Sequence, residues 1–191
     1  MKTTILCHNL LLPYIKENQI CIDATCGNGN DTLFLCRALK NTGCVLAFDI
    51  QNDAINNTKE ILDRNSYTNY KLFNQCHTKI KDVLIDQGID KANLIMFNLG
   101  FLPGGEKSIT TETDKTMEAI KQAIELLEPN GILSVMVYPG HFEGSIESST
   151  LDQYMDNLTD ENLSIFRLSN LKSKKSPYLI IIEKRWGSIA L

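Results

Sequence analysis

Two glycines and several polar side chains crowd into the short stretch CIDATCGNGND, residues 21 to 31. Its apolar lead is typical of a buried strand, so the glycines follow the point where that strand ends. One glycine is enough for a tight turn, and a second removes a further Cβ atom from the approach to the backbone. The stretch therefore predicts a ligand site at the end of the first strand.

An acidic residue follows at the spacing that nucleotide-binding sheets use. Asp49 ends the apolar run GCVLAFD and lies 22 residues after Gly27. In a doubly wound sheet, an acid at the end of the second strand binds ribose hydroxyls. We therefore expect Asp49 to bind the ribose of a nucleoside.

The glycine stretch departs from the dinucleotide fingerprint. Thr32 replaces the third glycine of G-x-G-x-x-G, which allows close helix packing beside a pyrophosphate. Asn28, Asn30 and Asp31 would crowd and repel a pyrophosphate, but they suit the ammonium and carboxylate of an amino-acid tail. The pattern therefore favours S-adenosylmethionine over NAD. The predicted cofactor residues are Gly27, Asn28, Gly29, Asn30, Asp31 and Asp49, with Gln51 after the second strand and Cys76 and His77 after the third.

A second polar stretch, FNLGFLPGGEKSITT, occupies residues 97 to 111 and follows the predicted fourth strand. Asn98 at this strand end resembles the Asn/Asp-Pro-Pro-Tyr type of motif in amino-group methyltransferases. There the amide oxygen and nearby carbonyls accept N–H bonds from the amine, which directs its lone pair at the methyl group. Positioning of this kind supplies several kcal/mol, so Asn98 is the predicted catalytic residue.

Composition indicates one soluble globular domain spanning residues 1–191. The chain carries a net charge of −4, 43% hydrophobic and 22% charged residues, and no apolar run approaches the ~18 residues of a membrane span. The apolar start lacks a signal-peptide cleavage site, so we expect a first helix there. The six cysteines contain no C-x-x-C pair, which predicts no metal site, no disulfide framework and a reducing cytoplasmic compartment. The net charge argues against non-specific nucleic-acid binding but allows a local basic patch.

Apolar runs alternate with helical patterns along the chain, which predicts βαβ units and a doubly wound α/β sheet. The last two of seven strands are joined only by a turn, so the last strand should be antiparallel in a mostly parallel sheet. The residues EPNG, 128–131, should end the long fifth helix. Strands are predicted at 19–24, 44–48, 70–74, 94–97, 132–138, 163–168 and 178–183, and helices at 31–39, 53–64, 78–87, 113–127 and 146–157.

Five stretches together resemble the YtqB-like family of class I methyltransferases: DATCGNGNDTLFL, FDIQNDAI, FNLGFLPGGEKSI, VYPGHFEGSIE and SPYLIIIEK. The resemblance covers nearly the whole chain and implies a Rossmann-like fold. The activity characterised in that family, MnmM, methylates the amine of 5-aminomethyl-2-thiouridine at the tRNA wobble position (U34), which gives 5-methylaminomethyl-2-thiouridine. The resemblance thus implies S-adenosylmethionine as cofactor, the tRNA anticodon arm as partner, and a homodimer.

The resemblance also implies roles for individual residues. Asn98 and Gly100 should border the reacting methyl group, and the cofactor site should be lined by Asn28, Asn30, Asp49, Gln51, Cys76 and His77. The chain departs from the family at Cys26 and Asn30, where ATMGNGHD is usual, and at Glu143, where a glycine is usual. A wobble base in a single-stranded loop can be splayed out and stacked. The predicted contacts to the substrate base are Phe101, Tyr138, His141 and Phe142. The lysines available to bind phosphates of the RNA backbone are Lys172, Lys174, Lys175, Lys71, Lys79, Lys81 and Lys107.

The predicted chemistry needs no strong general base. The fixed positive charge of a sulfonium lowers the pKa of a nearby amine by like-charge repulsion. Asp31 and His141 are the candidates if a base is used, and His8 lies near the cofactor edge by resemblance. Three other functions stay open: a methyltransferase of another RNA base or a small amine, a non-catalytic S-adenosylmethionine-binding module, and an NAD-linked oxidoreductase.

Overall fold

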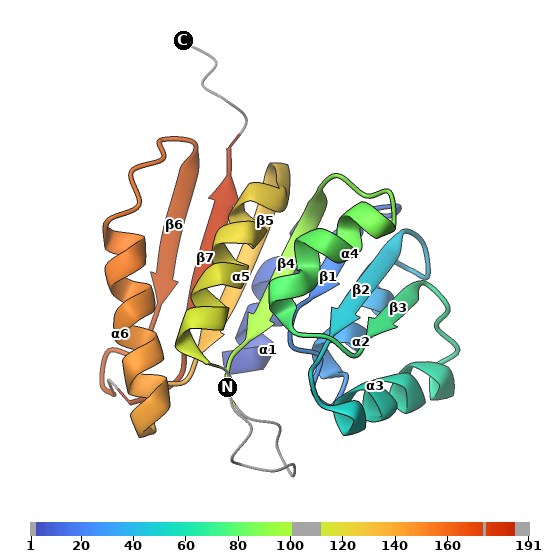
Figure 1. The fold of residues 1–191 in the computed structure, drawn as a ribbon, viewed down its shortest axis with the longest axis horizontal. Coiled ribbons are helices and arrows are strands. Elements are labelled where there is room, and N and C mark those ends of the chain that lie inside the picture. Colours follow the sequence, from blue (N-terminus) through green and yellow to red (C-terminus); the bar gives the residue numbers. More distant parts are fainter. Residues whose placement is uncertain (1–2, 101–111, 174, 186–191) are drawn as a thin grey trace.

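The computed structural model describes residues 3–100, 112–173 and 175–185. Within them, seven strands form one sheet in the order β3-β2-β1-β4-β5-β7-β6 (Figure 1). Strand β7 is antiparallel to both of its neighbours, β5 and β6, and the other pairs are parallel. The predicted mixed sheet is confirmed. The strands are β1 Ile20–Asp23, β2 Cys44–Phe48, β3 Tyr70–Phe73, β4 Ala92–Asn98, β5 Leu127–Val137, β6 Leu163–Leu168 and β7 Tyr178–Lys184.

Helices cover both faces of the sheet. In Figure 1, α4, α5 and α6 lie in front of the strands, and α1 and α2 lie behind them. The N-terminal segment is a helix, as its sequence predicts. The α-helices are α1 Thr3–Leu11, α2 Asn30–Ala38, α3 Asn52–Arg64, α4 Ile80–Asp86, α5 Thr113–Leu126 and α6 Phe142–Asp156, with 3-10 turns η1 Leu12–Tyr14 and η2 His77–Lys79.

The sheet separates two apolar cores, because successive side chains of a strand point to opposite faces. On β5, Leu133 and Val135 pack against the layer of α4, α5 and α6. Ile132 and Met136 pack on the opposite face, against α1, α2 and α3. This two-sided burial explains why the sequence of β5 is apolar without alternation.

The junction between α5 and β5 differs in detail from the prediction. The helix ends at Leu126, as the EPNG residues indicate, but the strand already begins at Leu127 rather than at Ile132. The pairing of β5 with β4 shifts between Leu127, opposite Ala92, and Ile132, opposite Leu94. Residues 128–131 therefore form a bulge inside the strand.

Helix α6 begins four residues earlier than the sequence pattern predicts, at Phe142 rather than Ile146. The cause is a cap: the backbone N–H of Gly144 donates to Nδ1 of His141, 3.0 Å away. A side-chain acceptor of this kind satisfies one of the unpaired donors of the first helical turn. Histidine is not among the residues that usually signal a helix start, so the pattern alone placed the start too late.

None of the helices in the described residues combines the length and the apolar composition needed to cross a membrane. No three His, Cys, Asp or Glu side chains in this described part of the chain are grouped so that they could hold a metal ion. The six cysteines are all free thiols.

Candidate active site

A cavity of about 500 Å³ opens at the carboxyl ends of β1, β2, β4 and β5. Its wall includes most of the residues that the sequence predicts for the cofactor and the acceptor. Among the described residues, Gly29 and Phe142 are the exceptions, and Phe101 lies outside the described residues. The predicted residues on the wall are Gly27, Asn28, Asn30, Asp31, Asp49, Gln51, Cys76, His77, Asn98, Gly100, Tyr138 and His141.

Asp49 is held by the backbone of two turns. One carboxylate oxygen, Oδ2, accepts from the N–H of Gly27 at 3.0 Å, and the other, Oδ1, accepts from the N–H of Gln51 at 2.9 Å. Each oxygen of a carboxylate has a second lone pair. Asp49 is therefore a rigid acceptor on the cavity wall, suited to a pair of neighbouring hydroxyl groups.

The two glycines of the opening turn have different structural tasks. Gly27 lines the cavity and has a left-handed φ of 52°. Gly29 is buried with a φ of 78°, and a Cβ atom there would lie 2.7 Å from Cγ2 of Ile61 and 2.8 Å from Cα of Thr58. The group that approaches Gly29 is thus helix α3. The sequence predicts a close approach at both glycines, and at Gly29 the neighbour is the protein itself.

Carboxylates gather beneath the opening turn. Asp23, only 1% exposed at the end of β1, accepts from the hydroxyl of Thr32 at 2.6 Å and from the N–H of Thr25 at 3.2 Å. Burial and the neighbouring Asp31 raise the pKa of Asp23. Thr32, which replaces the third glycine of the dinucleotide pattern, thus holds a buried acid. Buried acids of this kind favour a ligand that carries positive charge.

His77 lines the cavity and carries a buried ring nitrogen without a partner. Its side chain is only 8% exposed, and its ring packs edge-on against Phe97 with centroids 5.7 Å apart. Nε2 is buried without a hydrogen-bond partner. Burial, with a smaller effect of Lys115, lowers the pKa of His77 to about 4, so the ring is neutral at pH 7. A buried polar atom left without a partner is costly, which favours a ligand that hydrogen-bonds to His77.

Asn98 is the last residue of β4 and lines the cavity. Its backbone N–H donates to Oγ1 of Thr25 at 2.7 Å, and its side-chain Nδ2 donates to Oδ2 of Asp31 at 3.1 Å. Burial and the nearby Asp31 raise the pKa of the Tyr138 phenol. Asn98 is thus held at its backbone by Thr25 and at its side chain by Asp31.

The β5–α6 turn forms the outer wall. His141 lines the cavity, and its Nδ1 accepts from Gly144 as described above. A Cβ atom on Gly144 would lie 2.1 Å from the carbonyl oxygen of Tyr138, so only glycine fits this turn. Phe142 is 76% exposed, and Glu143 is exposed with a carboxylate oxygen 3.4 Å from Nδ1 of His141. The extra acid thus faces outward beside the histidine.

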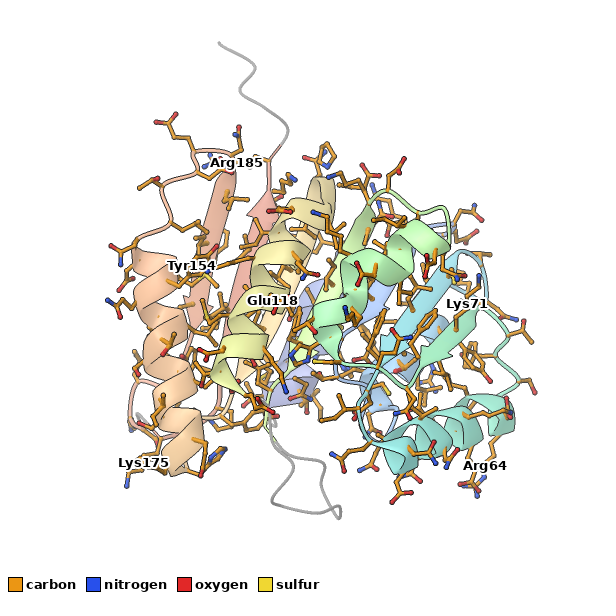
Figure 2. The ribbon with its side chains drawn as sticks, in the orientation of Figure 1. Arg64, Lys71, Glu118, Tyr154, Lys175 and Arg185 are labelled. Carbon is orange, nitrogen blue, oxygen red and sulfur yellow. The ribbon has the colours of Figure 1, made fainter. Side chains whose placement is uncertain are left out.

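Of the expected phosphate-binding lysines, Lys175 is the one that the structure places on the cavity wall among the described residues. Lys175 lies near the start of α6, at the opposite end of the molecule from Arg185 (Figure 2). Lys79 and Lys81 are exposed and paired with Asp82 and Glu125. Lys71 donates to Gln87, Lys172 is exposed, and Lys107 and Lys174 lie outside the described residues.

Several wall residues were not singled out by the sequence analysis. Thr25 anchors Asn98, and its position two residues after Asp23 was the only signal. Lys115 and Glu112 form an ion pair of 2.8 Å at the start of α5, which no motif marks. Ile50, exposed beside Asp49, adds an apolar wall. The remaining unpredicted wall residues are Ala24, Cys26, Gln75, Leu99, Gly140 and Pro177.

The sheet order, the antiparallel β7 and a polar cavity across the carboxyl ends of β1, β2 and β4 define a class I methyltransferase fold. A family model described as "Putative rRNA methylase" matches residues 45–184, and the chain belongs to this family.

Individual relatives agree with this assignment. An Arabidopsis thaliana protein named tRNA (mnm(5)s(2)U34)-methyltransferase, chloroplastic, is 36% identical over 193 residues, which is 96% of this chain and 70% of that protein. A crystal structure from Clostridium thermocellum with the same rRNA-methylase description has a TM-score of 0.88 at 34% identity, covering 96% of this chain and 98% of that chain. A Streptococcus mutans methyltransferase in complex with SAH has a TM-score of 0.84 at 31% identity, with the same coverage of both chains.

Proposed function

We propose that this protein transfers the methyl group of S-adenosylmethionine to the amine of 5-aminomethyl-2-thiouridine at wobble position U34 of tRNA, which gives 5-methylaminomethyl-2-thiouridine. Three findings support the proposal: the family membership, the Arabidopsis relative that carries this activity in its name, and the geometry of the cavity.

The residues on the wall fit S-adenosylmethionine. The orphaned Nε2 of His77 offers a partner to a polar group of the nucleoside, and Asp49 offers two fixed acceptors to its ribose hydroxyls. The acids Asp23 and Asp31 favour its cationic methionine end. When bound, this cofactor supplies an electrophilic methyl group on a positively charged sulfur. Cofactor contacts are also proposed for the wall residues Gly27, Asn28, Asn30, Gln51 and Cys76.

One observation carries the choice of an amine as acceptor. The side-chain N–H of Asn98 is directed to Asp31, which leaves its carbonyl oxygen Oδ1 as the acceptor atom of the amide. An oxygen acceptor at this point binds an N–H donor and leaves the nitrogen lone pair directed elsewhere. Asn98 thus orients the amine for attack, with Gly100 beside it on the wall.

The two candidate general bases are already engaged. Asp31 accepts a hydrogen bond on each carboxylate oxygen, from His8 and Asn98. Nδ1 of His141 accepts from the backbone of Gly144. Their contacts are those of orienting groups. Bound S-adenosylmethionine would place a positive sulfur beside the amine and lower the pKa of the amine, so that water would suffice to take its proton.

The acceptor end of the cavity suits an extruded wobble base. Tyr138 and His141 offer ring surfaces on the wall, and Lys115 and Lys175 add positive charge near its rim. In the same proposal, the partner is the anticodon arm of tRNA, the active form is a homodimer, and the enzyme is cytoplasmic. The dimer would let two small subunits share one anticodon arm.

Incubation of the protein with labelled S-adenosylmethionine tests this function. The substrates are tRNA from cells lacking the gene, fully modified tRNA as a control, and an extract of small amines. Nucleoside mass spectrometry should show one added methyl on 5-aminomethyl-2-thiouridine in the first tRNA only. Methyl transfer to small amines and not to tRNA would contradict the proposal, as would wobble uridines that remain unchanged.

A further inference from the structure

Helix α1 places an imidazole against the acid that orients Asn98. Nε2 of His8 lies 2.6 Å from Oδ1 of Asp31. The imidazole also stacks on Phe34 of α2, with ring centroids 4.0 Å apart and planes 3° from parallel. The stacking fixes the plane of the imidazole, so the direction in which Nε2 points is set by two helices.

Asp31 is held from both sides as a result. One oxygen accepts from His8, and the other accepts from Nδ2 of Asn98 at 3.1 Å. Its side chain is 10% exposed, so water has little access to replace either partner. A carboxylate bound at one oxygen only can rotate about its bond to the chain. The second partner, His8, removes this freedom.

The fixed position of Asp31 determines the orientation of the Asn98 amide. An asparagine amide has two N–H donors and one carbonyl oxygen, and a flip exchanges their positions. With Asp31 fixed as an acceptor, the Nδ2 side of Asn98 must face it, because two oxygens facing each other would repel. The orientation that exposes Oδ1 to the cavity therefore depends on Asp31.

We propose that His8 is a positioning residue for methyl transfer: it holds Asp31, and through Asp31 it keeps the Asn98 amide turned so that Oδ1 receives the acceptor amine. The expected effect of His8 on kcat rests on the proposed function. The effect of His8 on the orientation of the Asn98 amide does not depend on which substrate is methylated.

The matched variants are His8→Leu and His8→Gln. Both are close to histidine in size and can pack on Phe34, but only glutamine carries a donor near the position of Nε2. We expect His8→Leu to lower kcat on aminomethyl tRNA about tenfold, since a small misplacement of a positioning group has effects of this order or larger. Affinity for S-adenosylhomocysteine and the KM for tRNA should change less than threefold, and His8→Gln should stay within about threefold of wild-type kcat. Asn9→Ala, an exposed neighbour on α1, is the control and should leave all three unchanged.

A second measurement needs no substrate. NMR of the side-chain amides, with the Asn98 pair assigned by its loss in Asn98→Ala, reports the exchange of its two protons with water. Exchange should be about tenfold faster in His8→Leu than in wild type or His8→Gln, because Asp31 is then free to turn.

The outcomes separate the two proposals. Wild-type protein that leaves tRNA unmethylated would overturn the proposed function, and the amide exchange would still decide the role of His8. Wild-type kcat in His8→Leu, equal losses in the leucine and glutamine variants, or unchanged amide exchange would each overturn the positioning role.

Discussion

The two ends of the cavity are built in different ways. At the cofactor end, the acids are held by backbone groups and by a neighbouring hydroxyl: Asp49 by two N–H groups, and Asp23 by one N–H and Thr32. At the acceptor end, the side chain of Asn98 is held by another side chain, that of Asp31. Asp31 in turn depends on His8, from a helix that precedes the first strand.

The cofactor end thus serves to bind the cofactor, and the acceptor end serves to orient the acceptor amine. Backbone donors in a tight turn have fixed positions, so the cofactor end is preorganised by the fold itself. Side-chain partners can be lost one at a time, so the acceptor end can change its orientation without loss of the fold. Substitutions at the cofactor end should therefore affect affinity or stability, and those at the acceptor end should affect turnover.

The sharpest test of this separation is Asn98→Ala. We expect kcat on aminomethyl tRNA to fall about 100- to 1000-fold, the range seen when one oriented polar group is removed from an active site. Affinity for S-adenosylhomocysteine should change less than threefold by calorimetry, because the nucleoside partners remain. An equal loss of affinity and turnover would show that the two ends are not separable.

Asp49→Ala should have the opposite signature. We expect affinity for S-adenosylhomocysteine to fall about 100-fold, since two hydrogen bonds to a charged acceptor are lost. The matched control is Asp53→Ala, an exposed acid at the start of α3, which should bind like the wild type. Saturating cofactor should restore most of the turnover of Asp49→Ala. Unaltered binding in this variant would remove Asp49 from the cofactor site.

The glycines test whether the cofactor end depends on helix packing. Gly29→Ala should lower the free energy of unfolding, because its Cβ would lie 2.7 Å from Ile61 and 2.8 Å from Thr58. Gly88 also has a left-handed φ, 66°, but no atom within 4 Å of the added Cβ. Urea unfolding should therefore show Gly29→Ala to be less stable than Gly88→Ala by about 2 kcal/mol. Equal losses would mean that backbone strain, not the approach of α3, requires Gly29.

The smallest expected effect is a pH dependence at His77. Its pKa is lowered to about 4 in the folded protein from an ordinary 6.5, so the unfolded chain binds the extra proton between these values. The contribution of His77 to stability is therefore complete above pH 6.5 and is lost as pH falls toward 4. Between pH 7.5 and 5.5, wild type should lose about 1 kcal/mol relative to His77→Gln. Parallel pH profiles of the two proteins would contradict a buried neutral histidine.

Much of the fold could be predicted because its signals are local. Seven apolar runs, the turn between the last two strands and the position of EPNG identify the sheet and its antiparallel end. The start of α6 was placed too late, because its cap comes from His141, whose Nδ1 acts as acceptor only in this geometry. The position of β7 between β5 and β6 also has no local signal, since strand neighbours are chosen by packing.

The residues on the cavity wall were also predicted only in part. Asp49 and His77 follow strands and Asn98 ends one, and parallel strands bring such ends to one edge. Thr25 and Lys115 follow no comparable rule, and Gly29 has its neighbour in α3, about 30 residues along the chain. Residues tied to strand ends are thus visible in the sequence, and residues tied to helix packing are not.

For this protein, the sequence by itself determined the sheet, the end of the sheet that carries the chemistry and the family to which the chain belongs. These depend on hydrophobic periodicity and on short motifs, both of which are properties of neighbouring residues. Only the tertiary structure decided which side chains orient one another: Thr32 on Asp23, α3 on Gly29, and His8 on Asp31. The physical reason is that hydrogen bonds and close packing act over a few ångströms in space, whatever the separation along the chain.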